Sequence, residues 1–197
     1  MRWATVRIAT CGWWRQRSEK WGLSPFFGRD VRLTESGATF SRCRRWRYLL
    51  WRRWDATRPA ANFLMLNPST ADEVRLDPTC SRARSYAERW GYGALIVTNV
   101  FAFRSTDPDL MKAAEDPVGP GNDAAIVKAA KASAIVVCAW GNHGAFLGRS
   151  ARVQELLAGI PLHALRVNAN GEPAHPLYLP SRLSAVPLQR SASHSAE

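Results

Sequence analysis

Short, continuous apolar runs that alternate with helix-like segments constrain the fold of this chain more than any other feature. The runs are 63–66, 94–100, 134–140 and 162–167. Runs of this length are typical of strands that are covered on both faces, as in a parallel sheet. The alternation predicts an α/β fold in three layers, with helices on both faces of a central, mainly parallel four-stranded sheet.

Helix-start signals and apolar periodicity give the expected order of elements. Helices are expected at 78–90, 108–114, 122–132 and 151–158, and an additional strand is expected at 46–54. Asp77 and Asp107 are the expected N-caps of the first two helices, because each is followed by a proline at the first helical position.

Positive charge is concentrated in the first 60 residues of the chain. Residues 1–60 contain 14 of the 27 Lys and Arg residues but only four acidic residues, so the net charge of +11 arises almost entirely there. We expect residues 1–40 to be a basic, Trp- and Arg-rich extension, 41–188 to be the α/β domain, and 189–197 to be a disordered polar tail. The extension could bind bases and phosphates, be loosely packed, or be sequence upstream of the true start.

Arginine accounts for 23 of the 27 basic residues. Its guanidinium suits bidentate phosphate contacts and stacking, so we expect DNA as the partner of a monomeric protein. The alternative is an Arg-rich composition that reflects a GC-rich genome.

Several classes of protein lack their usual sequence signals here. The four cysteines occur singly, so neither a zinc site nor a disulfide framework is indicated, and reduced thiols are expected. There is no GxGxxG, GxxxxGKS/T or HExxH motif, and no run approaches the roughly 18 apolar residues of a membrane span. We expect a cytoplasmic protein without a metal ion, a cofactor or a membrane contact.

Polar side chains follow three of the predicted strands where each strand ends. Asn67, Asn99 and either Asn142 or His143 occupy these places. In open α/β sheets the carboxyl ends of the strands lie at one edge, and ligands bind there. The sequence therefore predicts a site at this edge, with ordinary strand-to-helix turns as the alternative.

Six motifs occur in order along the chain: MLNPSTAD, DPT with a helix ending in RWGYG, TNVFAFRSTDP, DPVGPGND, CAWGNHG and HPLYLP. Together they resemble a bacterial family known only as a domain of unknown function, over about residues 45–180. The family label itself implies no activity.

The layout also resembles, more distantly, the uracil-DNA glycosylase superfamily. That superfamily has an Asn-Pro or Asp-Pro pair after its first core strand, an Asn that reads a pyrimidine edge, a Trp-Gly pattern and a final His-Pro motif. The matching residues here, in the same order, are Asn67-Pro68, Asn99, Trp140-Gly141 and His175-Pro176. Two residues depart from the superfamily pattern: Leu66 replaces the usual Gly, and Leu177-Tyr178 replaces the usual Ser-Pro.

The resemblance implies a role for individual residues. His175 would hydrogen-bond the departing base, and Asn67 would orient the attacking water. Asp123 is the expected assisting carboxylate, in preference to Asp72 and Asp77. The base would bind among Asn99, Phe101 or Phe103, Ser69, Thr70 and Trp140. DNA phosphates would bind Arg44, Arg45, Arg104 and Arg182.

We therefore expect a monofunctional DNA glycosylase, which hydrolyses the N-glycosidic bond of a flipped-out damaged or modified base and leaves an abasic site. The departures favour hydroxymethylated or glucosylated cytosine in phage DNA, which would make the protein a phage-defence enzyme. Two alternatives stay open: a non-catalytic nucleic-acid-binding module, and a hydrolase of free nucleosides or nucleotide sugars.

Overall fold

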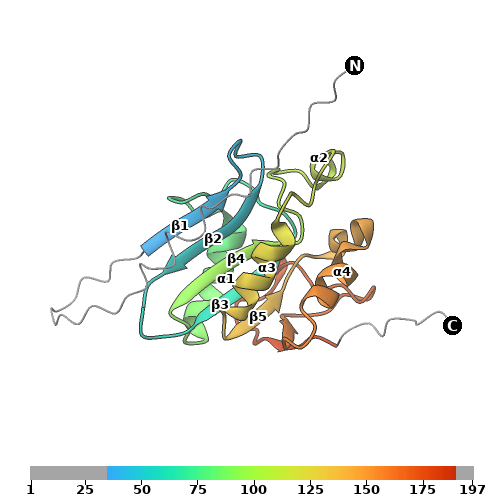
Figure 1. Cartoon of the computed structure of the whole chain (residues 1–197). Helices are drawn as coiled ribbons and strands as arrows, with labels where there is room; N and C mark the ends of the chain where they lie inside the picture. Colours follow the sequence, from blue (N-terminus) through green and yellow to red (C-terminus); the bar gives the residue numbers. More distant parts are fainter. Residues whose placement is uncertain (1–34, 190–197) are drawn as a thin grey trace, which may run out of the picture. The chain divides into compact units, whose positions relative to one another are not determined.

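The computed structural model describes residues 35–189, and its centre is one mixed sheet (Figure 1). The strands are β1 (Glu35–Phe40), β2 (Arg47–Arg53), β3 (Ala60–Met65), β4 (Ala94–Asn99), β5 (Ile135–Cys138), β6 (Leu162–Ala164) and β7 (Val186–Pro187). The seven strands lie in the order β1-β2-β4-β3-β5-β6-β7. The strands β4, β3, β5 and β6 are parallel, and the others join through antiparallel pairings. The predicted four-stranded parallel sheet is thus the core of a larger mixed sheet.

The first two of the four α-helices that the structure describes begin at the predicted start signals, and the other two begin after glycines. They are α1 (Pro78–Arg89), α2 (Pro108–Lys112), α3 (Asn122–Lys131) and α4 (Arg149–Leu156), with 3₁₀ helices η3 (Asn142–Gly148) and η4 (Pro176–Tyr178). Asp77 accepts a hydrogen bond from the Cys80 amide at 2.7 Å, and Asp107 accepts one from the Asp109 amide at 2.8 Å. Both predicted N-caps are confirmed. None of the helices in residues 35–189 is long and apolar enough to cross a membrane.

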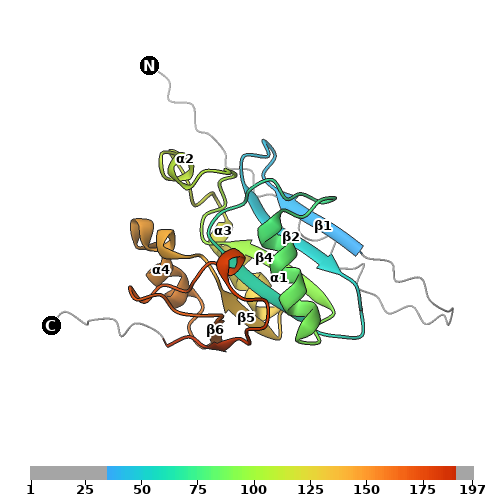
Figure 2. The same ribbon diagram turned by 180° about the vertical axis from the view of Figure 1, so that it is seen from behind.

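Successive side chains of β3 point to opposite faces of the sheet and build two cores. Phe63 lies on the α1 face, where its ring stacks on Trp90 at a centroid distance of 5.9 Å. Leu64 lies on the opposite face, in a cluster with Ile126 of α3 and Val153 of α4. The two views from opposite sides show α1 on one face of the sheet and α3 on the other (Figure 2). This alternation explains why β3 reads as a continuous apolar run.

The predicted start of the domain requires a correction. Residues Glu35–Phe40 pair with β2 along its length, so they belong to the sheet and not to the amino-terminal extension. The motif ESGATF has little apolar character because β1 is an edge strand whose side chains are only partly buried or exposed. The other residues of the predicted extension, 1–34, and residues 190–197 of the predicted tail lie outside the described residues.

The segments after β3 and β4 stay paired beyond the ends of the strands. The amides of Val100 and Phe101 donate to the carbonyls of Met65 and Leu66, each at 2.9 Å, and the Ser105 amide donates to the Pro68 carbonyl at 2.9 Å. Asn67 is therefore held against the segment that follows Asn99.

Candidate active site

A cleft of about 540 Å³ opens at the carboxyl ends of β3, β4 and β5. Its walls come from the segments after these strands, from the start of α1 and from η4. The predicted site residues that line it are Asn67, Ser69, Asn99, Trp140 and His175, together with His143 and Asn142. The structure thus brings together the three strand ends and adds His175 from a distant part of the chain.

The side-chain amide of Asn67 is held by its nitrogen. Its Nδ2 donates to the carbonyl oxygens of Ser105 at 2.8 Å and of Pro68 at 3.2 Å. A carbonyl oxygen can only accept a hydrogen bond, so both contacts require the NH₂ group to face the protein. The Oδ1 atom accepts no hydrogen bond within residues 35–189. Asn67 therefore presents an acceptor where it lines the cleft.

Asn99 is oriented the opposite way. It is buried, and its Oδ1 lies 3.5 Å from Nη2 of Arg47, which also lines the cleft. Its backbone carbonyl accepts a hydrogen bond from Nδ2 of Asn122 at 3.0 Å, which fixes the end of β4. The Nδ2 of Asn99 donates to none of residues 35–189. Asn99 therefore presents a donor.

His175 is a neutral donor. Its Nδ1 accepts a hydrogen bond from the Leu177 amide at 3.4 Å. Burial lowers the pKa of His175 below its ordinary value, and the nearby carboxylate of Asp77 opposes that change. The imidazole is therefore uncharged near neutral pH, and its proton is on Nε2 because Nδ1 is the acceptor.

Asp77 is the carboxylate that lines the cleft. One of its oxygens caps α1 through the Cys80 amide, and the side chain is largely buried. Burial, aided by the charge of Asp77, raises the pKa of the Cys80 thiol to about 12, so Cys80 stays protonated beside it. Asp77 was recognised from the sequence as a helix cap and ranked below Asp123 as the assisting carboxylate.

The preferred carboxylate, Asp123, lies outside the cleft. It is in the first turn of α3 and forms an ion pair with the buried guanidinium of Arg149. Arg149 also donates from Nε to the Val100 carbonyl at 2.7 Å, so the pair fastens α4 to the end of β4. Asp72 does not line the cleft either, and its carboxylate accepts hydrogen bonds from the backbone amides of Val74 and Arg75 in its own loop.

Two aromatic candidates are also engaged elsewhere. Phe101 is 0% exposed and packs on Phe146 at a centroid distance of 5.9 Å, so its ring is not available to stack on a base. Trp140 lines the cleft but is almost fully buried, and its indole N–H donates to the carboxylate of Glu172.

A second, more open groove of about 470 Å³ shares Ser69, Ser105 and Thr106 with the cleft. The remaining residues that line it are Arg44, Arg45, Thr70, Phe103 and Arg104. Arg104 and Arg44 both lie over the Phe40 ring, at 5.0 and 3.9 Å from its centroid. Three of the four predicted phosphate-binding arginines are therefore gathered beside the cleft, whereas Arg182 lines neither groove.

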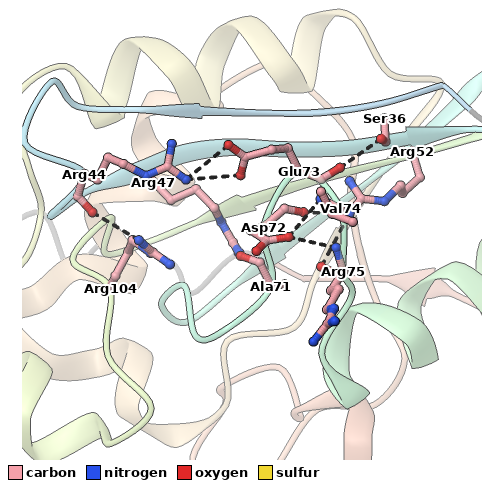
Figure 3. Close-up of polar contacts among 10 residues, drawn as sticks. All are labelled: Ser36, Arg44, Arg47, Arg52, Ala71, Asp72, Glu73, Val74, Arg75 and Arg104. Carbon is pink, nitrogen blue, oxygen red and sulfur yellow. Dashed lines mark hydrogen bonds and ion pairs between the residues drawn. The ribbon is translucent and has the colours of Figure 1, made fainter.

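Arginines of β2 fasten the loop that joins Asn67 to Asp77 (Figure 3). Arg47 donates from Nη1 to the Ala71 carbonyl at 2.6 Å. Arg52 donates from Nη2 to the Asp72 carbonyl at 2.6 Å. Arg44 adds an ion pair with Glu73 at 3.1 Å. No role was predicted for Arg47 or Arg52 from the sequence, and both are buried in the structure.

Within the described part of the chain, no group of three or more His, Cys, Asp or Glu side chains is placed to hold a metal ion. The groups that line the cleft include one carboxylate, two guanidinium groups, imidazoles, amides, hydroxyls and a thiol. This set can bind and polarise a substrate and accept one proton.

Comparison with protein families gave one match. The family described as "Protein of unknown function (DUF1643)" matches residues 47–177, which is more than half of the chain. The chain belongs to this family. The match confirms the motif-based resemblance over about residues 45–180, and the DUF1643 region contains every residue that forms the walls of the cleft except Tyr178. No curated protein and no solved structure matches the chain.

Proposed function

We propose that this DUF1643 protein hydrolyses the N-glycosidic bond of a nucleotide that is extruded from DNA into the cleft. The observation that carries the proposal is the convergence of four groups with complementary hydrogen-bonding states. They are the acceptor oxygen of Asn67, the NH₂ group of Asn99, the Nε2–H of His175 and the carboxylate of Asp77. Hydrolysis needs acceptors for the attacking water and donors for the departing base, and the cleft has both.

The two acceptor groups, the amide oxygen of Asn67 and the carboxylate of Asp77, would orient and deprotonate the attacking water. Cleavage of an N-glycosidic bond passes through an oxocarbenium-like sugar that water must attack. The oxygen of Asn67 can orient this water but cannot take its proton, because an amide is too weak a base. The carboxylate of Asp77 can take the proton, and it keeps lone pairs available after capping α1.

The donors would hydrogen-bond the base, which develops negative charge as it leaves. His175 and Asn99 each present one N–H-bearing group that is fixed by contacts on its other side. Preoriented donors at the place where negative charge develops stabilise the transition state in the manner of an oxyanion hole.

The basic groove beside the cleft favours a polymer as the substrate. Its three arginines lie over aromatic rings, Arg44 also pairs with Glu73, and Arg104 donates to the Arg44 carbonyl, while Nε of Arg104 is buried without a hydrogen-bond partner. Guanidinium groups arranged in this way suit the phosphates on either side of an extruded nucleotide.

The proposed base rests on the resemblance of the sequence motifs to those of the uracil-DNA glycosylase superfamily and on the departures from that pattern. The cleft volume is within the roughly 300–1,000 Å³ typical of small-molecule sites, so a base larger than uracil can be accommodated. Small side chains, Ser69 and Thr79, form part of the wall. These features support a modified cytosine, such as the hydroxymethylated or glucosylated base of phage DNA, and hence a role in phage defence.

Base release from DNA is the experiment that tests this function. The purified protein is incubated with DNA that contains unmodified, hydroxymethylated or glucosylated cytosine, or uracil, and with the corresponding free nucleosides. Alkali-labile sites and released base are then measured by mass spectrometry. We expect release from one DNA class, lost in Asn67→Ala and His175→Ala. Release from nucleosides alone would indicate a nucleoside hydrolase, and salt-sensitive DNA binding without any release would indicate a binding module.

A further inference from the structure

Arg47 is a buried cation at the cleft that forms no ion pair, although the charge of the Asp77 carboxylate and a contact with the Cys80 side chain favour its protonated form. It is 1% exposed, and none of the ion pairs within residues 35–189 includes it. Its Nε is buried without a hydrogen-bond partner. Burial lowers the pKa of the Arg47 side chain, yet a guanidinium keeps its proton in a protein. Burying a charge without an ion pair is costly, so the hydrogen bonds that the guanidinium makes to Ala71 and Asn99 contribute to keeping it in place.

The contact in question is with Asn99. A guanidinium has five donors and no acceptor, so a side-chain amide beside it must turn its oxygen toward it. The 3.5 Å separation between Arg47 Nη2 and Asn99 Oδ1 has this polarity. The amide oxygen is thereby occupied, and the NH₂ group is the part of Asn99 that remains for a ligand.

We infer that Arg47 is a positioning residue, which fixes the NH₂ group of Asn99 toward the cleft so that the substrate edge bound there is a hydrogen-bond acceptor. Such an edge is a carbonyl oxygen or an unprotonated ring nitrogen, as in the adjacent N3 and O2 of cytosine. The inference rests on the proposed function. The positive charge behind the amide also strengthens its donation as the departing base becomes negative.

Arg52 provides a matched control for Arg47. Both arginines come from β2, both are buried, and both donate to carbonyls of the loop between Asn67 and Asp77 (Figure 3). Burial lowers the pKa of each. Only Arg47 contacts Asn99 and lines the cleft. If the loop is loosened, base release should slow in substitutions of both Arg47 and Arg52. If the effect acts through Asn99, base release should slow only when Arg47 is substituted.

The kinetic test compares single-turnover base release and duplex affinity in Arg47→Met, Arg47→Lys and Arg52→Met. We expect Arg47→Met to release base roughly 100-fold more slowly, as for the loss of a donor to a developing anion, with duplex affinity nearly unchanged. Arg47→Lys keeps the charge and should recover part of the rate. Equal losses in Arg47→Met and Arg52→Met would overturn the inference. If Arg47→Met does not fold, Arg47→Lys and Arg52→Lys carry the test, with a slower release expected only for the first.

A second measurement does not depend on catalysis. The Asn99 side-chain amide signals are identified in ¹H–¹⁵N spectra by their loss in Asn99→Ala, and free cytosine is titrated into each protein. We expect cytosine to shift these signals in wild type and Arg52→Met but not in Arg47→Met. No shift in wild type, or equal shifts in all three proteins, would overturn the inference. Shifts as expected with no base release from any DNA would reject the proposed hydrolysis alone.

Discussion

Replacing Asp77 by Asn separates the chemistry of the cleft from the stability of the fold. Asp77 both lines the cleft and caps α1, and its capping oxygen accepts from the Cys80 amide at 2.7 Å. Asn is as good an N-cap as Asp, whereas Ala at such a site costs about 1 kcal/mol. Asp77→Asn should therefore keep the Tm of the wild type. Loss of the proposed general base should slow base release by about 10²- to 10⁴-fold, or roughly 3–5 kcal/mol in the activation barrier.

Single-turnover base release and thermal unfolding, measured on the same preparations, test this prediction. Asp123→Asn is the first control, because its ion pair with Arg149 lies outside the cleft. It should lower the Tm and leave release by the folded protein unchanged. Asp107→Asn is the second control, an exposed cap of α2 that should alter neither quantity. If Asp77→Asn released base at nearly the wild-type rate while Asp123→Asn did not, the assignment to Asp77 would be refuted.

Three further predictions concern stability and DNA binding. The folded-state pKa of His175 lies below 6.5, so the unfolded chain takes up this proton first as the pH falls. The contribution of His175 to stability is complete above about pH 6.5 and is lost as the pH drops through the folded-state pKa. Urea unfolding at several pH values should therefore show a free energy of unfolding that depends less on pH in His175→Gln than in wild type. An unchanged pH dependence would contradict this prediction. Arg104→Ala should reduce the slope of log affinity for DNA against log salt by about 1, whereas Arg152→Ala on α4 should not. The Cβ of Gly144→Ala would lie 2.0 Å from Trp140 Cδ1, and overpacking of this kind lowers the free energy of unfolding by about 1–3 kcal/mol. Calorimetry should therefore show a Tm several degrees lower than that of the wild type. An unaltered Tm would count against this packing of Trp140.

The central architecture was predictable because local signals and tertiary structure agree there. The four parallel strands are buried on both faces, so each is a continuous apolar run, and Asp-Pro pairs mark the starts of α1 and α2. The edge strand β1 has no such signal, because one pairing partner and partial exposure demand little apolar sequence. Its assignment to the sheet depends on pairing with β2, which is a tertiary contact.

The location of the candidate site was predictable from the sequence, but the roles of its individual residues were less so. The ends of β3, β4 and β5 had to meet at one edge, and Asn67 and Asn99 followed from that rule. The choice between Asp77 and Asp123 depended on an ion pair between α3 and α4 that no local pattern indicates. Asp77 was a candidate from the sequence, but it was ranked below Asp123 because Asp123 lies in the motif DPVGPGND.

The burial of Arg47 was also beyond sequence reasoning. Strict strand periodicity would place Arg47 on the face opposite Arg52 and the buried Leu50. The pairing of β1 with β2 is irregular there, however: Thr39 pairs with Leu49 and Phe40 with Arg47, so a β-bulge at Tyr48 interrupts the alternation. Arg47 is covered because the loop that follows β3 passes over it and accepts its hydrogen bond through Ala71. Only the path of that loop identifies this arginine as part of the cleft.

A crystal structure with a duplex whose target nucleotide carries a 2′-fluoro substituent tests the central claim most directly. The fluorine disfavours the oxocarbenium-like transition state, so the intact nucleotide should be trapped. We predict that it is extruded into the cleft, with its base edge on Asn99 and His175 and its glycosidic carbon facing Asp77 and Asn67. A nucleotide that stays stacked in the duplex, or binds away from these four residues, would contradict the account.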